Sequence, residues 1–282
     1  MQQHRKDWPL GVMARTLRVT RSGYYAWLGR EPSPRSHRRA TLSAAVVEVH
    51  RASRRTYGSP RVTAALKKDG VICCVNTIAR IMREEGLAAK VRRRFKVTTD
   101  SSHDLPTAPN RLARRFEQRR PNQAWVGDIT FIATEEGWLY LATEMDLYSR
   151  RIVGWSLSER MTSELVAAAL AMAIERRSPE TGLLHHSDRG CQYASGSFRG
   201  LLADHGMVCS MSRKGNAYDN APMESFYSTL KRELIHRTTY ATRDQARAAV
   251  FEYIEVFYNR RRLHSTLGYV SPADYEANGK FP

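Results

Sequence analysis

Cysteine is scarce in this chain of 282 residues, and long apolar runs are missing altogether. The four cysteines, Cys73, Cys74, Cys191 and Cys209, show no CxxC spacing, so neither a disulfide framework nor a structural zinc site is expected. A run of about 18 apolar residues, which a membrane-spanning helix needs, does not occur. The opening residues, MQQHRKDWPLG, lack the apolar core of a signal peptide. We therefore expect a cytoplasmic protein with no membrane partner.

Acidic residues are scarce in the first part of the chain only. Residues 1–122 contain 9 Asp and Glu against 27 Lys and Arg, whereas residues 123–282 contain 19 against 18. The whole excess behind the formal net charge of +17 thus lies in the first part. A basic region joined to a near-neutral one favours binding of a nucleic acid. A basic surface that is merely solvated is the alternative.

The basic part reads as helical. Residues 10–28 have the pattern of two short helices with a break at Ser22-Gly23. The Pro-, Ser- and Arg-rich stretch over 32–40 predicts a linker, and apolar residues at helical spacing predict a helix over 41–50.

Residues 57–87 have the pattern of a helix-turn-helix. Ser59 is the predicted N-cap of the first helix, and Asn76 is the predicted cap of the second. Arg80 and Arg83 face outward on that second helix, where they could contact DNA. An ordinary helical hairpin would look similar, but the charge of the region favours DNA binding.

A basic run, KVRRRFK, follows at 90–96. Such runs are usually solvated, but between two modules Arg92, Arg93 and Arg94 could follow a phosphate backbone. The chain then divides into four predicted parts. These are an N-terminal helical DNA-binding segment over 1–38, a helix-turn-helix domain over 39–95, a basic and polar linker over 96–121, and an α/β domain with C-terminal helices over 122–282.

The near-neutral part predicts a mixed sheet. Residues 122–134 alternate as a half-buried strand should, and two more strands follow by short turns as an antiparallel meander. A helix over 162–177 leads to the strand GLLHHSD, which a helical crossover makes parallel to its partner. A further helix, the short strand MVCSMS and a helix beginning at about Ala221, capped by Asn220, complete the series. This order is that of the ribonuclease-H fold, an α/β fold with a five-stranded mixed sheet and flanking helices.

Three carboxylates stand out by position. Asp128 lies on the first strand, Asp188 ends the fourth, and Glu224 lies in the first turn of the later helix. If the first and fourth strands are neighbours, the two aspartates reach one point. Three carboxylates at one point repel one another unless a cation is present, and hard divalent ions prefer such oxygens. Taken singly, each has another reading: a partner for a buried arginine, a turn residue, and a favourable charge at a helix N-terminus.

Neighbouring polar residues are less informative. Lys231 lies about 10 Å along the helix from Glu224, where it could meet a DNA phosphate or simply be an exposed lysine. His185 and His186 are adjacent and so face opposite ways on a strand, which argues against a shared metal and places at least one in the core. A supporting role for Glu144 and Asp146 on the second strand stays open.

Long motifs carry a resemblance to a known family. WVGDITFI, DLYSRRIVGWSLS, HHSDRGCQYAS, MSRKGNAYDNAPMESFYSTLKRE and YNRRRLHSTLGYVSPADYE resemble the integrase core of bacterial insertion-sequence transposases. The match is to the second-frame product of elements that encode two overlapping frames, and residues 57–87 resemble that family's helix-turn-helix. The resemblance implies a DDE-type transposase in which Asp128, Asp188 and Glu224 bind Mg²⁺, with Mn²⁺ as a substitute, and Lys231 is the matching lysine. Other residues in the matching motifs are implied to touch DNA: Arg189, Gln192, Tyr193, Asn216, Asn220 and His264.

The resemblance also implies a reaction and partners. The enzyme would cleave double-stranded DNA at the element's ends and use the released 3′-OH to attack target DNA, without a covalent protein–DNA intermediate. It would work as a homo-oligomer on DNA, with the upstream-frame product or fused to it. Two alternatives are a ribonuclease-H-like nuclease without strand transfer and a DNA-binding regulator with an inactive core. A retroviral-type integrase would bring an N-terminal His/Cys zinc module, whereas residues 1–122 contain only the adjacent Cys73 and Cys74.

Overall fold

A computed structural model describes residues 1–89 and 106–279 of the chain. The predicted DNA contacts Arg92, Arg93 and Arg94 lie outside the described residues. Within residues 1–89 the described elements are all helices, as expected, and they follow one another in the order α1 (Leu10–Thr16), α2 (Arg21–Leu28), α3 (Pro34–Ala52), α4 (Ser59–Lys68) and α5 (Val75–Glu84). None of the described helices is long and apolar enough to cross a membrane.

Two predicted breaks in this part are wrong. The stretch over 32–40 is not a linker, because α3 already begins at Pro34 and Ser33 caps it by accepting a hydrogen bond from the Ser36 backbone. A proline in the first turn and a serine before it mark a helix start as well as a loop. The dipeptide Ser22-Gly23 lies inside the first turn of α2, and the Gly23 amide donates to the Thr20 hydroxyl.

The caps of the predicted helix-turn-helix are also shifted. Gly58 precedes α4 and Cys74 precedes α5, so Ser59 and Asn76 are helical residues rather than caps. Each cap lies earlier than predicted. At both positions an extended backbone precedes the helix, and no side chain of the cap residue accepts a hydrogen bond from the first turn. The expected faces hold: Ile78, Ile81 and Met82 are buried, whereas Arg80 and Arg83 are exposed.

The second part is built on the five-stranded mixed sheet that the sequence predicts. Strands β1 (Ala124–Thr134), β2 (Gly137–Asp146) and β3 (Ile152–Ser158) form the antiparallel meander. Strands β4 (Leu184–Ser187) and β5 (Val208–Met211) add in parallel on the other side of β1, which gives the order β3-β2-β1-β4-β5.

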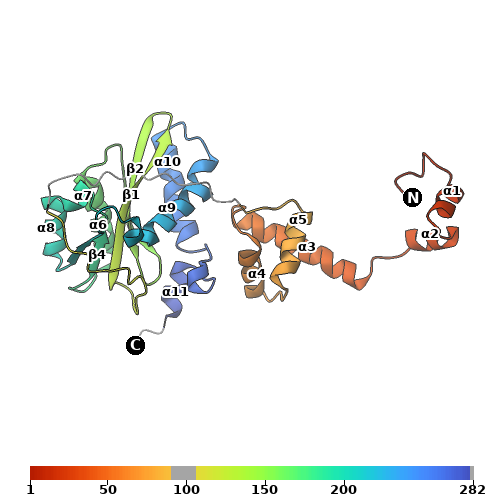
Figure 1. Ribbon diagram of the computed structural model, residues 1–282, viewed down its shortest axis with the longest axis horizontal. Helices are drawn as coiled ribbons and strands as arrows, with labels where there is room; N and C mark the ends of the chain where they lie inside the picture. Colours follow the sequence, from red (N-terminus) through yellow and green to blue (C-terminus); the bar gives the residue numbers. More distant parts are fainter. Residues whose placement is uncertain (90–105, 280–282) are drawn as a thin grey trace.

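Helices cover both faces of the sheet (Figure 1). On one face, apolar residues of the sheet pack against α6 (Ser163–Arg177) and α8 (Gly196–Asp204), with the short α7 (Cys191–Ala194) beside them. The other face packs against α9 (Ala221–Glu233), α10 (Arg243–Phe251) and the π-helix η3 (Glu252–Tyr258). Helix α9 begins at Ala221, as predicted. The remaining described elements are η1 (Ala217–Asn220), η2 (Ile235–Arg237), η4 (Ser265–Leu267) and α11 (Pro272–Asn278).

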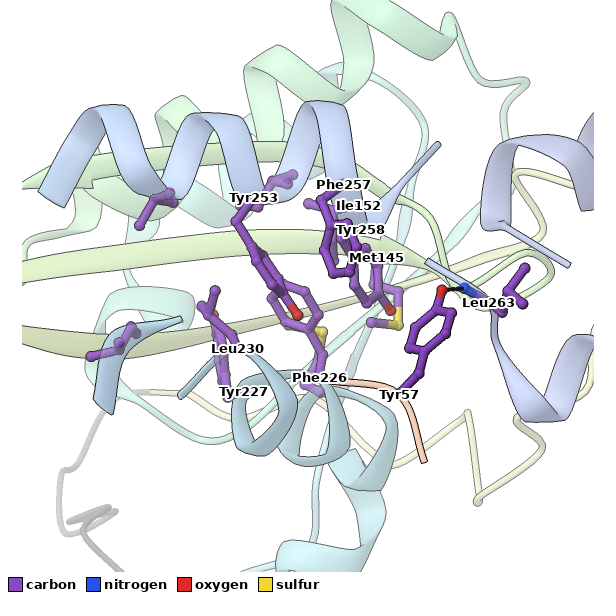
Figure 2. Packing of buried hydrophobic residues seen from close by; sticks show 14 of the residues in the cluster. Tyr57, Met145, Ile152, Phe226, Tyr227, Leu230, Tyr253, Phe257, Tyr258 and Leu263 are labelled. Atoms are coloured by element: carbon purple, nitrogen blue, oxygen red, sulfur yellow. Dashed lines mark hydrogen bonds between the residues drawn. The ribbon is translucent and has the colours of Figure 1, made fainter. Parts of the chain in front are cut away.

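The α3–α5 unit is joined to the sheet domain by a shared core. Tyr57, between α3 and α4, packs in the same apolar cluster as Phe226 and Tyr258 (Figure 2). Its hydroxyl accepts a hydrogen bond of 2.7 Å from the Leu263 amide, and Nε of Arg61 donates to the Leu263 carbonyl at 3.0 Å.

A buried ion pair lies beside this junction. Arg262 donates from Nε and Nη2 to both carboxylate oxygens of Glu233, at 2.9 and 2.8 Å, and both side chains are less than 5% exposed. The Tyr253 hydroxyl donates to the same carboxylate at 2.9 Å. Glu233 is the last residue of α9, so the C-terminal end of that helix is fixed by charge and geometry together.

At Gly154, β3 lies close to the backbone of α6. A Cβ at this position would lie 2.2 Å from the Ala169 carbonyl oxygen and 2.7 Å from the Ala173 backbone nitrogen. Gly154→Ala must therefore push α6 away from the sheet, and we expect a loss of about 1–3 kcal/mol in the free energy of unfolding. Urea denaturation measures the change.

Gly200 in α8 is the matched control, because no atom lies within 4 Å of the place that a Cβ would take there. Gly200→Ala should be neutral or stabilise the protein by up to about 1 kcal/mol, as alanine does in an open helical site. Equal effects at Gly154 and Gly200 would contradict the close approach of β3 and α6.

Candidate active site

The pairing of β1 with β4 brings two of the predicted carboxylates to one edge of the sheet. Val126 of β1 lies beside His186 of β4 in a parallel register. The same register, followed two residues further along each segment, reaches Asp128 on β1 and Asp188 just past the end of β4. The sequence expectation that these strands are neighbours is confirmed.

The charges of the three predicted carboxylates act on one another. The pKa of Asp128 is raised well above its usual value, first because the group is buried and then because the negative charges of Asp188 and Glu224 are near. Lys231 acts in the opposite direction. Backbone amides hold the two aspartates in place: the Ile129 amide donates to Asp128 at 2.7 Å, and the Gly190 amide donates to Asp188 at 2.9 Å.

Two side chains attach the start of α9 to the backbone of β1 on either side of the Asp128 side chain. Nδ2 of Asn220 donates to the Gly127 carbonyl at 3.2 Å, and the Tyr227 hydroxyl donates to the Asp128 carbonyl. Thr143 of β2 shares a 2.8 Å hydrogen bond with the same hydroxyl. Asn220 is thus the residue before α9, as predicted, but its side chain forms a hydrogen bond with β1 instead of capping the helix. These bonds place Glu224, in the first turn of α9, against the strand that carries Asp128.

Behind Asp128, a buried pair fills the sheet. Nε2 of His185 lies 2.9 Å from a carboxylate oxygen of Glu144, and both side chains are about 1% exposed. A Cβ on Gly127 would lie 2.8 and 2.9 Å from the two oxygens of Glu144, so a larger residue there would require this carboxylate to shift. Both predicted histidines are core residues: His186 is also fully buried, with a 2.8 Å bond to Ser210.

A cleft opens beside the aspartates. It has a volume of about 420 Å³, and its described lining includes Asp128, Asp188, Gln192 and Tyr193. Within residues 1–89 and 106–279, no three His, Cys, Asp or Glu side chains are arranged as ligands of one metal ion. The predicted donor set is nevertheless all carboxylate oxygen, which is the chemistry that hard divalent cations prefer.

Two basic residues that the sequence singles out border this region. Lys231 is half-buried on α9, with its Nζ 4.8 Å from the centre of the Phe131 ring. Its pKa is lowered by burial, while the charge of Asp128 raises it. Arg189, next to Asp188, is half-buried and donates from Nε to the Ser212 carbonyl at 2.7 Å.

The other predicted DNA contacts are distributed differently. Tyr193 is only 1% exposed and its ring packs on Phe198, yet it also lines the cleft beside the aspartates, so its contact with DNA stays a prediction. Nε2 of Gln192 donates to the Met161 carbonyl at the cleft. His264 is half-buried, its Nε2 lies 3.1 Å from the Tyr258 hydroxyl, and burial lowers its pKa to about 3.

Sequence reasoning missed the residue that organises the loop before α9. Asp219 is completely buried and accepts hydrogen bonds from Arg213, Arg114 and Asn110. Asn216, predicted to touch DNA, belongs to the same network, since its Oδ1 accepts from Nη2 of Arg114 at 3.0 Å. The signal available in the sequence was an aspartate six residues after an arginine in a glycine- and asparagine-rich loop. The more distant partners, Arg114 and Asn110, could not be read from it.

Comparisons with known proteins agree with this fold. Residues 118–217 and 224–278 match two integrase core domain families, and residues 37–95 match an HTH-like domain. In a simian T-cell lymphotropic virus intasome, solved in complex with PP2A regulatory subunit B56 gamma, one chain is similar with a TM-score of 0.50 and 17% identity. The similarity covers 78% of this chain and 72% of that one. The sheet and its helices therefore have the integrase-type, ribonuclease-H-like fold.

Sequence relatives define the family. The chain is 46% identical over 263 residues to the 31 kDa protein of insertion element IS600 from Shigella sonnei, which covers 93% of this chain and 97% of that protein. It is 42% identical over 278 residues to the transposase InsF of insertion sequence IS3A from Escherichia coli strain K12, with 98% and 96% covered. The chain belongs to the IS3 family of insertion-sequence transposases, and it is a DDE-type DNA transposase with an HTH-like domain and an integrase core.

The raised pKa of Asp128 predicts how stability depends on pH. The ionised carboxylate costs stability at every pH above its folded-state pKa, and the cost shrinks as pH falls toward the usual value of 3.8. In EDTA at pH 8, Asp128→Asn should therefore raise the melting temperature, because it removes the cost of the buried negative charge. The gain should decline as the pH is lowered.

The exposed Asp204 at the end of α8 provides the control, since Asp204→Asn should change stability little at any pH. A gain for Asp128→Asn that grew on acidification, or one that was absent at pH 8, would contradict the electrostatic account of the site.

Proposed function

We propose that Asp128, Asp188 and Glu224 form the catalytic triad of this transposase and bind Mg²⁺, for which Mn²⁺ can substitute. One observation carries the proposal: the parallel register of β1 and β4 brings Asp128 and Asp188 to the same edge of the sheet, and the charge of Glu224 on α9 also acts on Asp128. Such mutual repulsion in a partly buried site is tolerated when a cation neutralises it. The reading of each residue as an isolated structural carboxylate does not account for their convergence.

The residues present fit a divalent cation by their chemistry, since all three donors are carboxylates. When bound, two such ions would activate the attacking oxygen and stabilise the leaving oxygen of a phosphodiester. Asn220 and Tyr227 fix the backbone of β1 relative to α9, so they hold two of the three carboxylates in register before DNA binds. Lys231, beside Asp128, supplies a positive charge for a nearby phosphate of the DNA.

The reaction has two steps of the same kind. In the first, water attacks a phosphodiester at the element's end, a P–O bond forms, and the 3′ oxygen leaves as a 3′-OH. In the second, that hydroxyl attacks a phosphodiester of the target, and the target's 3′ oxygen leaves. Neither step needs a covalent bond to the protein, so no serine or tyrosine nucleophile is assigned.

The proposed partners follow from this reaction. The chain binds double-stranded DNA at the element's ends and at the target, in the bacterial cytoplasm, through residues 39–95 as the helix-turn-helix domain and 122–282 as the catalytic core. Residues 1–38 add a helical DNA-binding segment, and 96–121 form the basic linker. We further propose that it works as a homo-oligomer on DNA and together with the upstream-frame product or fused to it. Comparing the affinity of fused and unfused chains for the element's ends tests the last point, because equal end-specific affinity would contradict it.

A strand-transfer assay tests the catalytic assignment. A labelled DNA end with a pre-cut 3′-OH is supplied with Mg²⁺ and target plasmid, and joined product is measured. Asp128→Asn, Asp188→Asn and Glu224→Gln should each reduce joining by more than about 100-fold, because loss of a metal ligand exceeds the 10- to 100-fold typical of its supporting residues. Asp204→Asn, on the exposed end of α8, should join normally.

Two results would contradict the proposal. Cleavage without joining by the wild-type protein would favour a ribonuclease-H-like nuclease. Normal joining by Asp188→Asn would mean that this carboxylate is not catalytic. If instead the wild type bound DNA but neither cleaved nor joined it, a DNA-binding role without chemistry would be favoured.

A further inference from the structure

The loop between β5 and α9 is organised around one buried carboxylate. Asp219, in η1, is 0% exposed and lies five residues before Glu224. It accepts from the backbone amide, Nε and Nη2 of Arg213 at 3.0, 2.9 and 2.9 Å. It also accepts from Nε of Arg114 at 2.8 Å and from Nδ2 of Asn110 at 2.9 Å. These bonds hold the pKa of Asp219 well below its usual range, so the group is ionised.

The two arginines that Asp219 holds are themselves on the surface. The side chain of Arg213 is 57% exposed and that of Arg114 is 44% exposed. A guanidinium has five N–H donors, so a carboxylate that takes the Nε side leaves further donors on each side chain for an external acceptor. One carboxylate also neutralises only one of the two positive charges. The arrangement is therefore two fixed, water-facing guanidinium groups with a net positive charge.

A third arginine extends this arrangement to the catalytic carboxylates. Arg189 follows Asp188 directly, and its Nε donates to the carbonyl of Ser212, the residue before Arg213. We call Arg189, Arg213 and Arg114 the arginine row. It runs from Asp188, across the loop before α9, to residues 110–114, in the described part of the predicted linker over 96–121. That segment is itself held to the sheet, since the amides of Arg111 and Leu112 donate to Ser210 of β5.

We propose that the arginine row binds successive phosphates of the DNA backbone and leads the strand to Asp188, and that Asp219 is the positioning residue that orients two of its members. The proposal rests on the proposed function, because it takes DNA as the substrate. Arginine binds phosphate through a planar fork, and a fork already fixed by hydrogen bonds loses less conformational entropy on binding. The contact is to the backbone, so it is independent of base sequence.

DNA binding in the absence of chemistry tests the arginine row. A labelled duplex with the element's terminal sequence is titrated with the 282-residue chain in EDTA at several salt concentrations. Arg213→Gln and Arg114→Gln should each weaken binding by about 10-fold, as expected for a lost charged hydrogen bond. Each should also reduce the slope of log K against log salt by about 1. A duplex of unrelated sequence should show the same losses.

Matched variants separate charge from geometry. Arg199→Gln removes an exposed arginine from α8 and should change the affinity far less. Arg213→Lys keeps the charge but loses the fork, and it should weaken binding nearly as much as Arg213→Gln. Asp219→Asn adds one positive charge to the protein, so net charge alone predicts tighter binding, whereas loss of orientation predicts weaker binding. The arginine variants alter exposed side chains, so they decide the question even if Asp219→Asn fails to fold.

The outcomes are distinguishable from failure of the proposed function. Asp188→Asn and Glu224→Gln should abolish joining while keeping the affinity in EDTA, whereas Arg213→Gln and Arg114→Gln should lower that affinity. Wild-type affinity and salt slope in both arginine variants would overturn the arginine row and leave the catalytic triad standing. Tighter binding by a folded Asp219→Asn would overturn the positioning role of Asp219. A wild-type protein that bound neither the terminal nor the unrelated duplex would overturn the arginine row, whereas the strand-transfer assay still decides the catalytic triad.

Discussion

The parallel pairing of β1 with β4 is the constraint on which the active site depends. Parallel neighbours need a crossover, and here the meander continues through β3 and α6 before the chain returns beside β1. Because the two strands run the same way, their corresponding positions advance together, and Asp128 and Asp188 come to the same edge. An antiparallel β4 would have carried Asp188 to the opposite end of the sheet. Local features such as the Gly190 amide bond only refine a position that the topology has already set.

Helix α9 is fitted to that edge by bonds to the main chain rather than to the carboxylates. Asn220 and Tyr227 both donate to carbonyls of β1, so they fix the main chain of the strand that carries Asp128. The buried Glu144–His185 pair and the bare Cα of Gly127 support the strand from behind. The free energy that folding gains elsewhere thus offsets the cost of burying Asp128 near the negative charges of Asp188 and Glu224.

Sequence alone predicted the features that repeat locally. Strand alternation, the change to helical spacing and the proline after Asn220 were sufficient for the sheet, for α6 and for the start of α9. The predicted caps Ser59 and Asn76 were wrong. A helix can begin without a side-chain cap, and the residue types at such a start do not reveal its position. The linker over 32–40 was wrong because the same residues that favour loops also begin helices. The burial of Tyr193 and the role of Asp219 depend on residues far away in the chain, so no local pattern contained them.

The two ends of α9 contact different parts of the molecule. Glu224 lies in its first turn. Glu233 lies nine residues, or about 14 Å, further along the helix and forms an ion pair with Arg262. The backbone of Leu263, the residue after Arg262, forms hydrogen bonds with the side chains of Tyr57 and Arg61 of the α3–α5 unit. The helix is thus a strut whose far end rests on the junction between the two halves of the protein. The position of the α3–α5 unit and the position of Glu224 are consequently coupled, because the same rigid helix connects them.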